Sequence, residues 1–373
     1  MKIAQIAPLF ESVPPKAYGG TERVVSYLTE ALVAAGHEVT LFASGDSVTR
    51  ARLAPMAERS LRLDPARPDW IMWHTMMIDR VFEQAHRFDV LHFHIDFLHY
   101  ALAQRCAQPC VTTMHGRLDL KDLLPLHTHF QAHPLVSISN SQRVPLSQAN
   151  WCGTVYHGLP MQMYEFQPEP QDYFAFVGRI SPEKRVDRAI EIAIACNTRL
   201  RIAAKVDAAD QAYFEGTIRP MLDHPLIEFV GEIGDAQKSE FMGRARALLF
   251  PIDWPEPFGL VMIESLACGT PVIAYERGSV PEVLQHGVTG FIVRNQQEAI
   301  DAARRIGTID RRRCREVFEK RFSADKMAAR YVQVYQALID ARKPAPEETG
   351  QGTRAGATLA HGNDIQGPAW HGR

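Results

Sequence analysis

Both halves of the chain repeat one pattern, in which a short apolar strand is followed by a helix and then by another strand. In the first half, residues 1–7 read as a strand, 22–35 as an amphipathic helix and 39–43 as the next strand. Units of this kind build parallel sheets. Further buried runs follow at 90–93, 110–114 and 135–138. The first half is therefore predicted to be one α/β domain.

The second half restarts the pattern after a connector rich in Gly, His and Pro. Residues 173–178 form the first predicted strand, 184–196 a helix and 200–204 the next strand. Later strands are predicted at 227–230, 247–250, 272–275 and 290–293, and a long helix at 324–342. We therefore predict two Rossmann-like domains, 1–157 and 158–342, and a disordered, Gly-rich and Pro-rich tail over 343–373.

Size and charge support a two-domain globular protein. The 373 residues exceed the roughly 150 of a common domain, and 46% apolar residues can fill two cores. The formal net charge is -2, which supplies no basic field for nucleic acid. A dedicated nucleic-acid binder is not expected.

Cysteine usage and hydropathy indicate a reducing compartment. The six cysteines contain no C-x-x-C pair, so neither a disulfide framework nor a zinc module is expected. The apolar stretch within residues 1–10 is too short for a signal segment, and no other run reaches membrane-spanning length. The sequence predicts a cytoplasmic protein with no integral membrane segment.

Loops that follow strands are the places to seek a binding site, because facing Rossmann-like domains bind ligands at the carboxyl ends of their strands. The loop 178–184 follows a strand, opens a helix and carries Arg179 and Lys184, which suits a diphosphate. Two solvated loop cations explain the pair equally well. Gly19 and Gly20 form a similar but weaker feature in the first domain.

The strongest local signal is a pair of carboxylates separated by seven residues. Glu256 lies in a loop after a strand, and Glu264 is expected about two turns into the following helix. Eight positions are close to two helical turns, so both can face one side and accept hydrogen bonds from sugar hydroxyls. On spacing alone, a helix-dipole partner and a surface glutamate explain the pair better.

Together these segments resemble the family 4 glycosyltransferases of the GT-B fold, which are retaining enzymes with nucleotide-sugar donors. The resemblance covers residues 1 to about 342. It rests on an ordered set of motifs: Tyr18-Gly19-Gly20-Thr21-Glu22, Thr113-Met114-His115-Gly116, Gly178-Arg179-Ile180-Ser181-Pro182-Glu183-Lys184, the block from Glu256 to Glu264, and Ala267-Cys268-Gly269-Thr270-Pro271-Val272.

The resemblance implies roles for particular residues. Arg179 and Lys184 would hold the donor diphosphate, Glu264 the ribose, and His115 would lie beside the anomeric centre. Glu256 would hold the transferred sugar. The resemblance also places Gly19, Gly20 and the backbone of Phe258, Gly259 and Leu260 at the donor, and Tyr18, His94 and Asp96 at the acceptor.

The implied reaction moves a hexose from a nucleotide-sugar to an acceptor hydroxyl with retention at the anomeric carbon. UDP-glucose is the first expectation for the donor and GDP-mannose the second. Fixed cations would offset the charge of the departing diphosphate, so neither a metal nor another cofactor is expected. The chain departs from the family at its linker, where His157-Gly158 replaces a frequent Asn-Gly pair.

Several other residues have two interpretations. His92 and His94 share one face of a strand, a metal-like spacing that lacks a third ligand. Asp96 suits either an acceptor or a loop cap. The basic run 311–315 is compatible with contact to an anionic membrane, although a solvated helix face fits better. Trp70 and Trp73 suit acceptor stacking or a small satellite core equally.

Other enzyme and binding classes remain as alternatives. A nucleotide-sugar 2-epimerase, a phosphorylase-like enzyme and a catalytically silent nucleotide-sugar sensor would share the fold. A nicotinamide dehydrogenase is not expected, because the first strand-to-helix loop lacks G-x-G-x-x-G, and no P-loop motif occurs.

Overall fold

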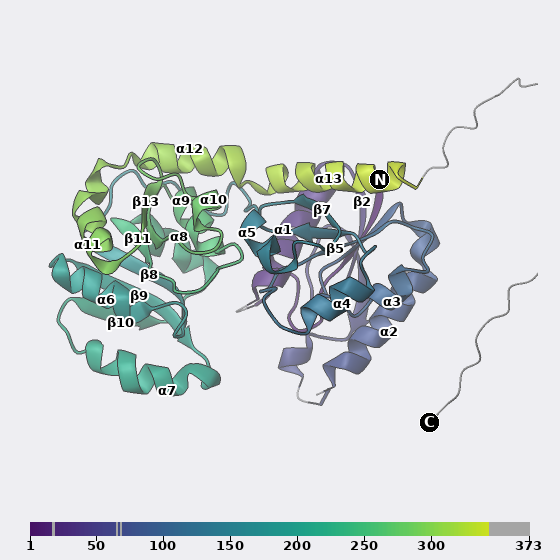
Figure 1. The fold of residues 1–373 in the computed structure, drawn as a ribbon, viewed down its shortest axis with the longest axis horizontal. Coiled ribbons are helices and arrows are strands. Elements are labelled where there is room, and N and C mark those ends of the chain that lie inside the picture. Colours follow the sequence, from purple (N-terminus) through teal and green to yellow (C-terminus); the bar gives the residue numbers. More distant parts are fainter. Residues whose placement is uncertain (17–18, 65, 68, 343–373) are drawn as a thin grey trace, which may run out of the picture.

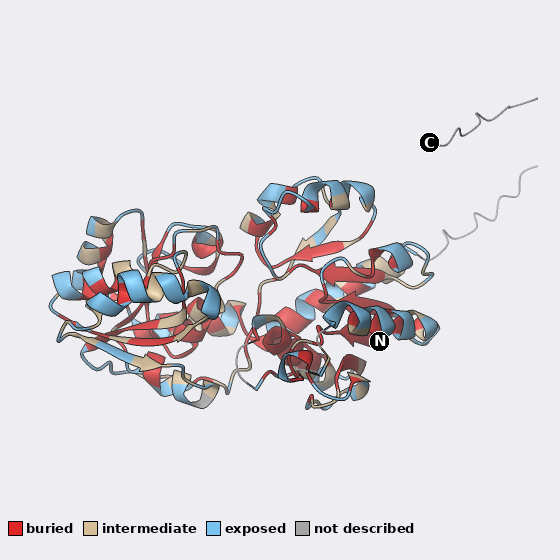
Figure 2. Cartoon of the chain, turned by 90° about the horizontal axis from the view of Figure 1, so that it is seen from below, coloured by how far each residue is buried: buried red, intermediate tan, exposed pale blue. Residues whose placement is uncertain are grey.

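The protein folds into two α/β lobes, as the computed structural model shows (Figure 1). The structure describes residues 1–16, 19–64, 66–67 and 69–342. The predicted disordered tail, 343–373, lies outside the described residues. Buried residues concentrate in the strands and the inner helix faces of both lobes (Figure 2).

The first lobe is built on a seven-stranded sheet in the order β3-β2-β1-β4-β5-β6-β7, and all of its strand pairs are parallel. The order reverses between β1 and β4, so the loops after these two strands diverge and leave a crevice. The strands are β1 (Lys2–Ile6), β2 (Glu38–Ser44), β3 (Arg52–Ala57), β4 (Val90–Phe93), β5 (Cys110–Thr113), β6 (Leu135–Ser137) and β7 (Trp151–Thr154).

The second lobe repeats this plan with a six-stranded parallel sheet in the order β10-β9-β8-β11-β12-β13. Its order reverses between β8 and β11, which places a second crevice after those strands. The strands are β8 (Tyr173–Ile180), β9 (Arg199–Val206), β10 (Ile227–Gly231), β11 (Ala247–Phe250), β12 (Val272–Tyr275) and β13 (Gly290–Val293).

Helices connect the parallel strands in both lobes. Their bounds are α1 (Gly20–Ala34), α2 (Trp70–Glu83), α3 (Tyr100–Ala103), α4 (Leu123–His129), α5 (Asn140–Arg143), α6 (Val186–Ala195), α7 (Gln211–Tyr213), α8 (Asp235–Gly243), α9 (Leu260–Ala267), α10 (Val280–Val283), α11 (Gln296–Arg305), α12 (Arg311–Arg321) and α13 (Ala324–Asp340).

The last helix, α13, packs on the first lobe although it follows the second in the chain (Figure 1). The Tyr335 hydroxyl accepts a hydrogen bond from Gln5 Nε2 at 3.0 Å, and the Tyr331 hydroxyl lies 2.8 Å from Thr113 Oγ1. From its position in the sequence, we predicted that this helix belongs to the second domain, 158–342. Its contacts are instead with the first lobe. The chain therefore crosses between the lobes a second time, just before α13.

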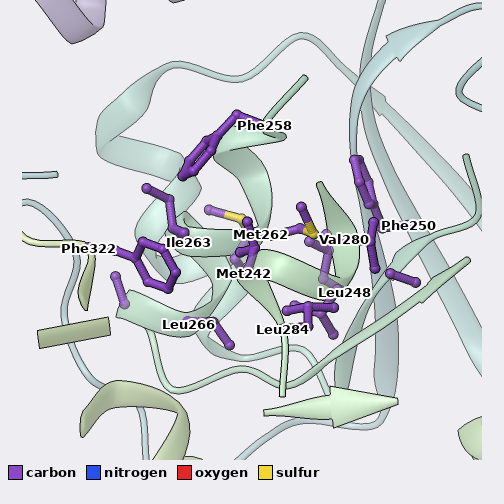
Figure 3. Close-up of a cluster of buried hydrophobic side chains, with 14 of the residues drawn as sticks. Met242, Leu248, Phe250, Phe258, Met262, Ile263, Leu266, Val280, Leu284 and Phe322 are labelled. Atoms are coloured by element: carbon purple, nitrogen blue, oxygen red, sulfur yellow. The ribbon is translucent and has the colours of Figure 1, made fainter. Parts of the chain in front are cut away.

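A buried cluster in the second lobe fixes the helix that carries Glu264 (Figure 3). Met262 and Ile263 of α9 are fully buried and belong to the same core as Leu248 of β11 and Phe258. A helix whose apolar face is anchored in this way has little freedom to rotate. The packing therefore holds Glu264 in a fixed position.

Candidate functional site

A cavity of about 490 Å³ lies at the carboxyl ends of β8 and β11 and is lined by residues from both lobes. It brings together nearly all of the residues that the sequence singled out for a donor: Gly19, Gly20, His115, Arg179, Lys184, Glu256, Phe258, Gly259, Leu260 and Glu264. Its place at the point where the strand order reverses is where open α/β sheets bind ligands. The motifs that are scattered in the sequence therefore form one site.

Lys184 and Glu256 both line this cavity and form an ion pair with each other. The indole Nε1 of Trp254 also donates to Glu256 Oε2 at 3.0 Å, and Lys184 Nζ lies 5.3 Å from the Trp254 ring centroid. Glu256 is nearly buried, at 9% exposure, so its charge needs these partners. The pair holds a cation and a carboxylate side by side on the cavity wall.

The backbone that follows Glu256 turns sharply into α9. Gly259 adopts the left-handed region at φ 75°, and a side chain there would meet Met262, Phe250 and Glu256. α9 begins at the next residue, so the free N–H groups of its first turn lie at the cavity. Such a turn favours negative charge.

Glu264 lies one turn into α9, not two as the sequence spacing suggested, because the helix begins at Leu260. The carboxylate is buried, at 3% exposure, and Lys238 Nζ of α8 lies 3.6 Å from its Oε1. Lys238 lies 3.4 Å from Asp235, which in turn pairs with Arg23 of the first lobe. These three partners were not foreseen, since nothing in their local sequence marks them.

Arg179 lies at the end of β8, where two carboxylates already contact it. Its Nη1 is 3.6 Å from Asp207 and its Nε is 3.4 Å from Asp210. Arg179 lines the 490 Å³ cavity and an adjoining cavity of about 430 Å³ that also touches Lys205 and Glu232. The two cavities are therefore continuous around this guanidinium.

On the first lobe, His115 heads a chain of hydrogen bonds that leads into the core. His115 Nε2 lies 2.8 Å from His94 Nδ1, and His94 Nε2 lies 2.8 Å from Gln5 Oε1. Because the Gln5 oxygen only accepts, His94 donates from Nε2 and accepts at Nδ1, and His115 donates from Nε2. Burial lowers the pKa of His115 to about 3, so its ring is neutral. His115 Nδ1 is left as a lone pair with no hydrogen-bond partner among the described residues.

The linker residue His157 stacks on this ring. The His115 and His157 centroids are 5.4 Å apart at 17°, and Phe258 packs edge-on against His157 at 4.8 Å. His157 therefore joins the His115 segment to the loop before α9. The sequence marked His157 only as an unusual linker residue.

A third cavity, of about 390 Å³, lies in the crevice between β1 and β4 of the first sheet. His94 and Asp96 line it, and it shares His115 with the larger cleft. Tyr18, the other residue expected at the acceptor, lies outside the described residues. Trp70 lines this cavity, whereas Trp73 packs on the apolar core and beneath Arg67, as its satellite-core interpretation predicted.

His92 is buried and forms hydrogen bonds inside the first lobe. Its Nδ1 lies 2.6 Å from the Tyr335 hydroxyl and its Nε2 lies 2.7 Å from Thr113 Oγ1. Both nitrogens are thus occupied by protein groups. His92 helps to seat α13 on the first sheet.

Two family models match the chain in succession along its length. The model for glycosyltransferase family 4 matches residues 18–145, and the model for glycosyl transferases group 1 matches residues 164–317. The second range contains Arg179, Lys184, Glu256 and Glu264. The chain belongs to this family of glycosyltransferases.

Similar proteins match 90–91% of the length of this glycosyltransferase. An uncharacterized glycosyltransferase of Methanocaldococcus jannaschii is 22% identical over 91% of this chain and 99% of its own. Sucrose-phosphate synthase from Thermosynechococcus elongatus has a TM-score of 0.76 at 19% identity, covering 91% of this chain and 100% of its own. HepE of Anabaena, solved with UDP-glucose, has a TM-score of 0.71 at 15% identity, covering 90% and 100%. The two-lobed GT-B fold is therefore common to all of these structures.

The basic run 311–315 of the glycosyltransferase is not a uniformly solvated face, which corrects the expectation from its sequence. Arg311 is buried and donates to the carbonyl oxygens of Gln167, Gly243 and Ala245. Arg315 donates to the carbonyl oxygens of Met161, Tyr164 and Ala267. Both cations thus tie α12 to the linker and to the second lobe. Among the described residues, no helix combines the length and apolar character that crossing a membrane requires.

Proposed function

We propose that the protein transfers glucose from UDP-glucose to an acceptor hydroxyl, with retention at the anomeric carbon and without a metal. The observation that carries this proposal is the Lys184–Glu256 ion pair near the N-terminus of α9, in the cavity that Arg179 also lines. It offers a cation for phosphate and a carboxylate for sugar hydroxyls within one cavity. HepE, a GT-B neighbour, was solved with UDP-glucose, which supports this choice of donor.

The diphosphate is assigned to Lys184, Arg179 and the first turn of α9. Cleavage of the glycosyl phosphate bond builds negative charge on the departing oxygen, so groups that favour this charge stabilise the transition state more than the ground state. Glu256 contacts Lys184, and Asp207 and Asp210 contact Arg179. These carboxylates hold the two cations in place before the donor binds. Such preorganised charges supply what a divalent metal supplies elsewhere.

The nucleoside is assigned to the adjoining 430 Å³ cavity, with the ribose at Glu264. Arg179 and Lys238 line both cavities, so a ligand that extends from one cavity into the other passes these two side chains. The buried carboxylate of Glu264 can accept hydrogen bonds from both ribose hydroxyls, which is the geometry of a vicinal diol. Lys238 Nζ lies 3.6 Å from that carboxylate and fixes its position.

His115 is assigned to the sugar. Its neutral ring and the lone pair at Nδ1 make it an acceptor for a hydroxyl hydrogen, and its Nε2–H fixes the ring against His94. Attack by the acceptor on the face that the diphosphate leaves gives retention, and a phosphate oxygen takes the acceptor proton. The side chains then position and stabilise charge and form no covalent intermediate.

The proposal is tested by calorimetry of the purified protein with UDP, GDP and ADP and their glucose or mannose derivatives, all in EDTA. We expect UDP and UDP-glucose to bind and to raise the melting temperature, because a ligand that binds only the native state stabilises it. The Glu264→Gln variant should lose affinity for UDP. Selective binding of GDP would overturn the choice of donor, and binding that needs added divalent metal would overturn metal independence.

A further inference from the structure

The cavity between β1 and β4 is placed to hold the second substrate of the transfer reaction. Its volume is about 390 Å³, and it shares His115, Gly116 and the Gly19–Gly20 turn with the donor cleft. A ligand in this cavity therefore lies against the same histidine as the transferred sugar. The composition of its walls bears on what that ligand is.

One wall is aromatic and held rigidly. Trp70 at the start of α2 is 39% exposed, and its ring centroid lies 5.4 Å from that of Phe10 and 5.7 Å from that of His74. His74 Nδ1 donates to the Trp70 carbonyl at 2.7 Å, and its Nε2 accepts from the Leu9 amide at 3.1 Å. Both ring nitrogens are used, so His74 is uncharged and fixes the two segments that carry the wall.

Two carboxylates, those of Glu22 and Asp96, also line the cavity. Glu22 of α1 is buried, at 6% exposure, and Asp96 has no hydrogen bond or ion pair among the described residues. Within the part of the chain that the structure describes, Arg62 is the one Lys or Arg side chain that lines the cavity, and it is paired with Glu11 at 3.0 Å. Burial raises the pKa of Glu22, whereas Asp96 is an exposed residue at the cavity. A phosphate in this cavity would lie near the carboxyl groups of Glu22 and Asp96. Arg62, which could attract it, already pairs with Glu11.

We propose that this cavity selects a neutral, hydroxyl-rich ring, that is, an unphosphorylated sugar acceptor. One face of such a ring carries C–H groups that pack on the Trp70 indole, while its hydroxyls donate to Asp96 and Glu22. One of these hydroxyls then lies beside His115, where the transfer occurs. This inference rests on the proposed function and adds to it the chemical class of the acceptor.

The test uses the full chain with UDP-glucose and three methyl glycosides, those of glucose, galactose and mannose, each paired with the 6-phosphate of the same hexose. Release of UDP is followed by NMR, and binding of each sugar to the UDP-loaded protein is followed by saturation transfer. We expect at least one methyl glycoside to raise UDP release about tenfold or more, and its phosphate partner to have no such effect.

Variants on one helix identify the binding wall. Trp70→Ala should raise the KM for the active glycoside about tenfold or more and leave the Kd for UDP unchanged, and Trp70→Phe should restore much of the effect. Met72→Ala is the matched control, because Met72 is exposed on α2 and does not line the cavity. Asp96→Asn should also raise the acceptor KM without changing UDP binding.

Two results would overturn the inference while leaving the donor site intact. The first is that the protein binds UDP, but its release of UDP is raised more by the hexose phosphates than by the methyl glycosides, or is raised by none of the methyl glycosides. The other is an acceptor KM that Trp70→Ala and Met72→Ala change equally. Failure to bind UDP at all would instead overturn the proposed function, so the two failures are distinguishable.

Discussion

His115 Nε2 lies 2.8 Å from His94 Nδ1, and this contact fixes the ring that separates the donor cleft from the crevice of the first sheet. The chain of donors and acceptors ends at Gln5 Oε1, which accepts from His94. Burial lowers the pKa of His115 and keeps the ring neutral, and the hydrogen bond to His94 leaves Nδ1 as the unprotonated nitrogen. A neutral acceptor beside the sugar suits a reaction in which the departing diphosphate carries the developing negative charge.

We therefore expect His115→Ala to lower kcat/KM for UDP-glucose by about a hundredfold, since one positioned hydrogen-bond partner of the transition state is lost. UDP contains no hexose, so its Kd should stay within about twofold of the wild-type value. Steady-state kinetics and calorimetry measure the two quantities. His129→Ala is the control, because His129 is exposed on the first lobe and lines none of the three cavities. Equal kinetics in both variants would remove His115 from the site.

Lys184 should be essential for turnover and dispensable for folding. Lys184→Ala is expected to lower kcat by about a hundredfold to a thousandfold, because a cation that stabilises the leaving group is lost. The variant should still fold, with a lower melting temperature, because the nearly buried Glu256 loses one partner and keeps its hydrogen bond from Trp254. Arg219→Ala, which breaks only an exposed pair with Glu215, should leave kcat unchanged. A wild-type rate in Lys184→Ala would contradict the diphosphate assignment.

Adjacent arginines at the start of α12 should differ sharply in their effect on stability. Arg311 is buried and satisfies three backbone carbonyls and Thr270 Oγ1, so Arg311→Ala leaves several buried acceptors unpaired. We expect it to lower the free energy of unfolding by about 3 kcal/mol or more. Arg312 is exposed, and Arg312→Ala should change the same quantity by less than about 0.5 kcal/mol. Urea unfolding measures both, and similar values would refute the structural role of Arg311.

Stability should fall as the pH drops below neutrality, because burial lowers the pKa of His94 and holds those of His115 and His133 at about 3. In the unfolded chain these rings take up protons near pH 6.5. Their contribution is therefore complete above that value and is lost progressively as the pH falls from about 6.5 toward 3. Each ring accounts for about 1.4 kcal/mol per pH unit in this window. A melting temperature that is constant from pH 7.5 to pH 5 would contradict this.

Local pattern predicts the parallel strands well, because strands buried on both faces are short, nearly continuous apolar runs. The runs at 247–250, 272–275 and 290–293 coincide with β11, β12 and β13. The sequence did not indicate β3 or the helix α2. β3 lies at the sheet edge, where one side of the strand is unpaired and its burial is partial, so its residues do not form a fully apolar run.

The site could be predicted as a set of residues but not as a set of contacts. Glu256 and Lys184 were each singled out, yet nothing in the sequence shows that they pair with each other. The same holds for Arg23 with Asp235, which lie on different lobes. Contacts between segments distant in the chain depend on how the two sheets pack, and local spacing carries no information about that. The packing of α13 on the first lobe could not be predicted from the sequence for the same reason.

The central claim is that the cleft between the lobes cleaves UDP-glucose without a metal. Incubation of the protein with UDP-glucose in EDTA, followed by NMR of the products, tests it most directly, because slow transfer to water reports on the same chemistry without a known acceptor. We expect UDP and, as the first-formed sugar, α-glucose, with both signals lost in Lys184→Ala. First-formed β-glucose would contradict retention. UDP release that appears only when divalent metal is added, or that persists in Lys184→Ala, would contradict the assigned mechanism.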